Sequence, residues 1–81
     1  MDKKALAEEI IDFSSKYRLF NNAETMNIDS VAEQLNESWF VEHLIHTIIV
    51  KARYKENVDN QKLKELLLEF EKVRLDLEYR D

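Results

Sequence analysis

The sequence predicts an all-α fold, a small antiparallel helical bundle of three to four helices that forms a single domain over residues 1–81. Apolar residues recur at three- and four-residue spacings in each periodic segment, as on one side of a helix, and no segment alternates with period two. The chain also contains neither glycine nor proline, which supply most of the tight turns of sheet-rich folds.

The first helix is predicted over about residues 3–19, followed by a loop over residues 21–26. Steps of four and three residues place its apolar side chains on one narrow stripe. The stripe consists of Leu6, Ile10, Phe13, Tyr17 and Phe20. Asn21, Asn22 and Thr25 then break this pattern with residue types that favour turns and caps.

Three further helices are predicted: a short one capped by Asn27, one over about residues 37–55 and one over about residues 59–80. The third carries apolar residues on two sides, which is typical of a central helix. Combining the main faces predicts a core of Leu6, Ile10, Phe13, Tyr17, Leu44, Ile48, Leu66, Phe70 and Val73.

Two further apolar faces remain outside this core, and they are the most informative feature for function. The third and fourth helices carry them as Trp39, His43, His46, Val50 and Tyr54, and as Leu68, Leu75 and Tyr79. We interpret these eight residues as protein-binding, because Trp and Tyr are frequent at interaction hot spots and a short chain gains stability by association. The alternative is that the third helix is central in the fold and that the leucines are scattered surface residues.

Charge and composition limit the partners and the compartment. Twelve Lys and Arg residues against seventeen Asp and Glu residues give a net charge of −5, which disfavours nucleic acid and anionic membranes. The absence of cysteine excludes disulfides, thiolate metal sites and thiol catalysis, and it fits a reducing cytoplasm. The N-terminal segment lacks the apolar core of a signal peptide, and no apolar run is long enough to cross a bilayer. We therefore expect a cytoplasmic protein that does not bind membranes.

The sequence contains no recognisable metal-binding or catalytic motif. His43 and His46 lie three residues apart beside Glu42, whereas a zinc-peptidase pair needs a four-residue spacing with glutamate directly after the first histidine, where Leu44 stands. Acidic residues lie on faces opposite the apolar stripes, where charges are normally solvated. We assign no metal, no cofactor and no catalytic residue, and we expect the protein not to be an enzyme.

A basic segment near the end of the third helix keeps a second function class open. Lys51, Arg53 and Lys55 surround Tyr54, as in some nucleic-acid-binding helices. However, Glu37 and Glu42 stand in the half of that helix that would approach the phosphates, and cations at a helix C-terminus also complement its dipole.

One short run resembles a known family. The run Ser38, Trp39, Phe40, Glu42, Leu44 and Ile45 is similar to part of the theta-type accessory subunit of bacterial replicative polymerases. That subunit has three helices, whereas a long fourth helix is predicted in this chain. The similarity covers a small part of the sequence, and no residue role is carried over from it.

The sequence therefore predicts a small cytoplasmic protein-binding module, a regulator, adaptor or inhibitor, that contacts another protein or a second copy of itself. The alternatives are a nucleic-acid- or transcription-linked protein, including an acidic mimic of the phosphate backbone, and a small helical enzyme.

Overall fold

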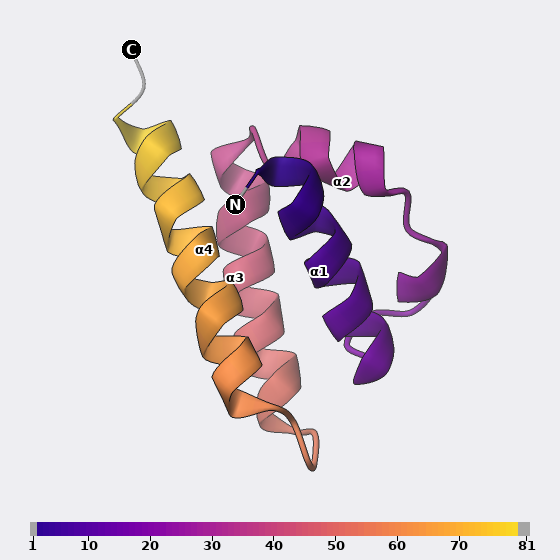
Figure 1. The fold of residues 1–81 in the computed structure, drawn as a ribbon. Coiled ribbons are helices and arrows are strands. Elements are labelled where there is room, and N and C mark those ends of the chain that lie inside the picture. The colour runs from indigo at the N-terminus through magenta and orange to yellow at the C-terminus, as the bar shows by residue number, and fades with distance from the viewer. Residues whose placement is uncertain (1, 80–81) are drawn as a thin grey trace.

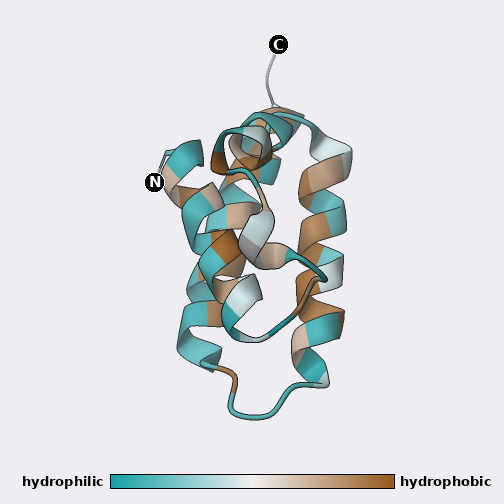
Figure 2. Cartoon of the chain, turned by 90° about the vertical axis from the view of Figure 1, so that its right-hand side faces the viewer, coloured by the Kyte–Doolittle hydropathy of each residue, from teal (hydrophilic) through white to brown (hydrophobic). Residues whose placement is uncertain are grey.

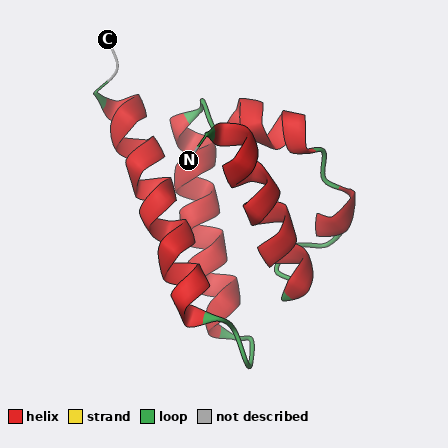
Figure 3. Cartoon of the chain, viewed as in Figure 1, coloured by secondary structure: helices red, strands yellow, loops and turns green. Residues whose placement is uncertain are grey.

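The computed structural model describes residues 2–79, apart from the side chain of Glu24, and these residues form helices and no strand (Figure 3). The elements are α1 (Lys3–Lys16), the 3₁₀ turn η1 (Ala23–Thr25), α2 (Ile28–Gln34), α3 (Ser38–Arg53) and α4 (Asn60–Glu78). This confirms the prediction of an all-α fold and a small helical bundle. The predicted end of the last helix at Arg80 lies outside the described residues.

The long helices α1, α3 and α4 lie side by side, and the short helix α2 lies across one end of the molecule (Figure 1). α4 runs antiparallel to both α1 and α3, but α1 and α3 run in the same direction. α1 and α3 share a direction because α2 lies between them in the chain, and the consecutive helices α3 and α4 are antiparallel as predicted. Residues 17–27 lead the chain back toward the end where α1 begins, so α3 starts from that end again (Figure 1).

α1 ends earlier than predicted, because the chain turns at a left-handed residue without using glycine. Arg18 has φ 52°, and the Leu19 N–H donates to the Ser14 carbonyl at 2.9 Å, which is the hydrogen bond of a Schellman motif. Leu19 is buried, so the turn is held by packing as well. Non-glycine residues take this conformation at an energetic cost, so the sequence pattern contains no clear signal for it.

α2 and α4 begin at side-chain capping residues, whereas α3 begins after Glu37, whose side chain makes no capping hydrogen bond. The Asn27 side chain accepts from the Ser30 N–H at 2.9 Å, and the Asp59 side chain accepts from the Lys62 N–H at 3.0 Å. The backbone N–H of Asp59 also donates to the Tyr17 hydroxyl at 2.9 Å, which connects the end of α1 to the start of α4.

The core contains most of the predicted residues, but the number of sides that α1 and α3 bury differs from the prediction. Leu6, Ile10, Phe13, Leu44, Ile48, Leu66 and Phe70 are buried, whereas Tyr17 and Val73 are partly buried against the core. α1 also buries Ala7, Ile11 and Ser14, because α2 packs on one side of it and α4 on another. α3 buries one side only, so the interpretation of α3 as the central helix is wrong.

Candidate protein-binding surface

The outer side of α3 carries a line of five residues that we call the α3 stripe: Trp39, His43, His46, Val50 and Tyr54. Steps of four, three, four and four residues keep these side chains in line along the helix. The exposed fractions of Trp39 and Tyr54 are 63% and 80%, both histidines are exposed, and Val50 is half-buried. α3 forms one edge of the molecule in Figure 2, so its outer side is accessible.

Trp39 is exposed but not isolated. Its ring meets the Phe40 ring edge-on, with centroids 5.7 Å apart and planes at 79°. Phe40 is partly buried against the core. The contact therefore restrains the indole while leaving most of it in solvent, which lowers the entropy that a partner would have to remove on binding.

Glu42 and Arg53 lie on the same flank of the α3 stripe, because they are about three helical turns apart. Both are exposed, and neither forms a hydrogen bond or an ion pair within residues 2–79, although the Glu42 charge acts on Arg74 of α4. The flank of α3 thus has an acidic N-terminal half and a basic C-terminal end.

A second group, which we call the α4 patch, consists of Leu68, Leu75 and Tyr79 on the outer side of α4. All three are exposed, while Leu66 and Phe70 of the same helix point into the core. The α3 stripe and the α4 patch each lie on the side of their helix that faces away from the core. The two groups share no residue and belong to different helices.

The two histidines of the chain are both part of the α3 stripe. The His43 Nε2 atom lies 3.5 Å from the Thr47 hydroxyl oxygen. Within residues 2–79, no group of three or more His, Asp or Glu side chains is placed to hold one metal ion. Lys51, Arg53 and Lys55, the basic cluster, are exposed at the C-terminal end of α3, where Lys51 and Arg53 belong to the last turn.

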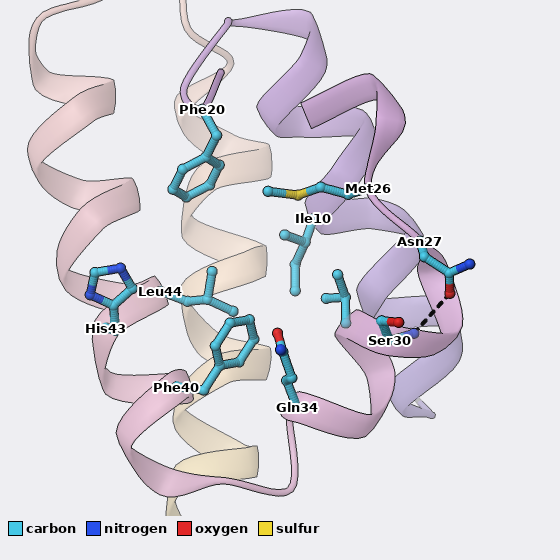
Figure 4. A pocket seen from close by; sticks show the side chains of 10 residues that line it. Ile10, Phe20, Met26, Asn27, Ser30, Gln34, Phe40, His43 and Leu44 are labelled. Carbon is cyan, nitrogen blue, oxygen red and sulfur yellow. Dashed lines mark hydrogen bonds between the residues drawn. The ribbon is translucent and has the colours of Figure 1, made fainter. Parts of the chain in front are cut away.

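The structure also contains an apolar groove that the sequence did not predict (Figure 4). It has a volume of about 340 Å³ and lies between α3 on one side and α1, α2 and the segment between α1 and α2 on the other. Its walls are mainly apolar and consist of Ile10, Phe20, Met26, Val31, Phe40 and Leu44. The polar residues Asn27, Ser30, Gln34 and His43 complete the lining.

A second hollow adjoins this groove and has a different character. It is lined by Ser30, Glu33, Gln34 and Glu37, so it shares Ser30 and Gln34 with the groove. Glu33 and Glu37 are exposed, and neither carboxylate forms an ion pair within residues 2–79. An apolar wall and an unneutralised acidic rim thus lie next to each other.

Sequence reasoning missed the groove because its residues come from separate segments that only the tertiary fold brings together. Phe20 was predicted to belong to the stripe of the first helix, but α1 ends before it. Met26 and Phe40 fitted none of the predicted helix faces, and these two unassigned large apolar residues were the available signal.

The clearest electrostatic feature of α4 is a bidentate ion pair between Glu71 and Arg74. The Arg74 Nε atom donates to Glu71 Oε2 at 3.1 Å, and Arg74 Nη2 donates to Glu71 Oε1. These hydrogen bonds lower the pKa of Glu71 from its ordinary value and raise the pKa of Arg74. The pair belongs to α4 itself and lies outside both the α3 stripe and the groove.

The lowered pKa predicts a pH dependence with a defined direction. A carboxyl whose pKa falls on folding stabilises the folded state above its unfolded pKa, and this contribution is lost as the pH falls through the folded pKa. In an NMR titration of the Glu71 carboxyl, we expect a midpoint below the ordinary glutamate value, and a return to that value in Arg74→Gln. An unchanged midpoint in Arg74→Gln would contradict the assignment of the shift to Arg74.

Comparison of the chain with protein-family models, with curated proteins and with solved structures finds no match in any of the three. None of the helices formed by residues 2–79 combines the length and the hydrophobicity that crossing a membrane requires.

Proposed function

We propose that this chain is a protein-binding module, a small regulator, adaptor or inhibitor that acts by contact and not by catalysis. The observation that supports it is the α3 stripe: Trp39 and Tyr54 remain largely in solvent although the core is complete without them. Large aromatic side chains in water are disfavoured by about 25 cal/mol per Å² of apolar surface, and burying them drives association. Trp and Tyr are also the residue types most enriched at interaction hot spots.

The partner that fits this stripe is a second copy of the chain, packed antiparallel along α3. In such a pair the two copies are related by a two-fold axis, so the N-terminal half of one stripe faces the C-terminal half of the other. The flank of α3 that carries Glu42 and Arg53 in one copy then lies beside the same flank of the second copy. Trp39 of one copy then meets Tyr54 of the other. Glu42 meets Arg53 on the shared flank, so the dimer contains two Glu42–Arg53 pairs that the single chain does not have.

The expected association is weak, because one helix face is smaller than a standard interface of about 20 to 30 residues on each side. The net charge of −5 on each copy opposes contact at long range, but salt at about 0.15 M screens charges beyond about 8 Å. Short-range pairs such as Glu42 with Arg53 are less affected by this screening.

Sedimentation equilibrium at increasing protein concentration tests the proposal. We expect the mean mass to rise from that of the monomer toward that of the dimer. Trp39→Ala and Tyr54→Ala should each shift this transition to concentrations at least about tenfold higher, because each substitution removes two symmetric contacts per dimer.

Matched controls distinguish association through the α3 stripe from non-specific association through other exposed apolar residues. Tyr79→Ala removes an aromatic ring that is 78% exposed, similar to Tyr54, but it lies on α4 and should leave the transition unchanged. The double variant Leu68→Asp/Leu75→Asp, confined to the α4 patch, should also match the parent. A chain that stays monomeric at all concentrations, or one whose dimer is lost in the α4 variants and kept in Trp39→Ala, would overturn the assignment to α3.

A further inference from the structure

The groove between α3 and the α1–α2 half is large enough to hold a bulky side chain. Its volume of about 340 Å³ is at the lower end of the range for ligand pockets, about 300 to 1,000 Å³. Phe20 and Met26 line one end, and Phe40 lies at the other, with Ile10 and Leu44 between them (Figure 4). Met26 is 36% exposed, so part of this apolar wall is in water.

Polar groups at the rim are placed to bind the backbone of an incoming segment. Neither the Ser30 hydroxyl nor the Gln34 side-chain amide has a hydrogen-bond partner within residues 2–79, whereas the Asn27 side chain is already used as the cap of α2. A peptide carries an N–H donor and a C=O acceptor at each residue, and the Gln34 amide has both complementary groups. An apolar small molecule would leave these rim groups unused.

The charge beside the groove determines the sign of its partner. Glu33 and Glu37 border the adjoining hollow without a basic partner in the described chain. Asp29, on the same short helix, pairs with Lys4 at 3.5 Å, so this cation is engaged with a different acid. A Lys or Arg side chain of an incoming segment would complement these two carboxylates, while an acidic segment would be repelled.

We infer that the groove binds a short amphipathic segment of another protein, with a bulky apolar side chain in the groove and a Lys or Arg about one helical turn away in the Glu33–Glu37 hollow. This site shares His43 with the α3 stripe but no other residue. The groove faces the space between α3 and α2, whereas the stripe lies on the outer side of α3.

The probe is a fluorescein-labelled synthetic peptide of about 15 residues in which Leu at helical spacing alternates with Lys. One control peptide has Glu in place of each Lys, and another has Ala in place of each Leu. We expect saturable binding of the Leu–Lys peptide by fluorescence anisotropy, with binding at least about tenfold weaker for both controls. Amide chemical-shift changes in the labelled protein should cluster at the residues that line the groove.

Two substitutions with the same change of charge distinguish the groove from general attraction to an acidic protein. Met26→Asp places a carboxylate in the apolar wall and should weaken binding at least about tenfold, although the added negative charge would strengthen purely electrostatic binding. Leu68→Asp adds the same charge on α4 and should leave the affinity within about twofold. Glu33→Gln/Glu37→Gln should reduce the preference for the Leu–Lys over the Leu–Glu peptide.

Equal affinity of Met26→Asp and Leu68→Asp, or chemical-shift changes that follow Trp39, His46 and Tyr54 of the α3 stripe, would overturn this inference. Circular dichroism tests whether Met26→Asp is folded. If it is unfolded, the chemical-shift changes of the parent protein decide whether the peptide binds in the groove. Met26→Asp should keep the parental sedimentation behaviour. A change in that behaviour would identify the occupant as a second copy and contradict the inference. If Trp39→Ala loses the α3 dimer but still binds the peptide, the inference about the groove is supported.

Discussion

Phe70→Ala is expected to lower the free energy of unfolding by about 3 to 5 kcal/mol, the usual cost of replacing a buried phenylalanine by alanine. The Phe70 side chain is fully buried on the inner face of α4 and is the largest fully buried side chain of the described residues. A chain of this length has a total stability of about 4 to 12 kcal/mol. The variant should therefore be partly unfolded at room temperature or lose most of its resistance to denaturant.

Urea unfolding followed by circular dichroism measures this effect. Tyr79→Ala is the matched control, because it removes an aromatic side chain from the same helix at a position that is 78% exposed. Its free energy of unfolding should lie within about 0.5 kcal/mol of the parent value. If Phe70→Ala unfolded at the same urea concentration as the parent protein, α4 would not be part of the core.

A pair of aspartate substitutions two residues apart tests which side of α4 faces inward. Leu66 is 1% exposed and Leu68 is 58% exposed. Leu66→Asp forces a carboxylate into the core, where it must lose its hydration or become protonated, and we expect a loss of more than about 4 kcal/mol, a large part of the total stability. Leu68→Asp places the same group in water and should change stability by about 0.5 kcal/mol or less.

Thermal melts of the two variants give the comparison directly. The melting temperature of Leu68→Asp should remain close to that of the parent, whereas that of Leu66→Asp should be much lower. Because both variants carry the same added charge on one helix, a difference between them reports burial alone. Similar melting behaviour of the two would contradict the orientation of α4.

Much of the fold could be predicted from the sequence, because helix periodicity and capping are local properties. Asn27 and Asp59 both cap helices through their side chains, and the spacing of Leu66, Phe70 and their neighbours correctly identified the inner side of α4. The end of α1 was less predictable. Arg18 turns the chain in a left-handed conformation that asparagine or glycine would have signalled more clearly.

Of the candidate surfaces, the exposed helix faces could be predicted from the sequence, whereas the groove could not. Each residue predicted to bind protein is exposed in the structure, except Val50, which is half-buried. This exposure follows from the helical period, since a second stripe opposite the core stripe must face away from the core. The groove could not be predicted, because Phe20, Met26 and Phe40 lie in three different segments and only their packing brings them to one place.

The sequence by itself determined which segments are helical and which side of each helix is apolar, because these depend on spacing within one segment. Only the tertiary structure decided how many neighbours each helix has. α1, with a narrow predicted stripe, is enclosed by α2 and α4, whereas α3, with two apolar sides, lies at an edge. The physical reason is that a side chain is buried by residues far away in the chain, and the path of residues 17–27 places α2 against α1 and leaves the outer side of α3 in solvent.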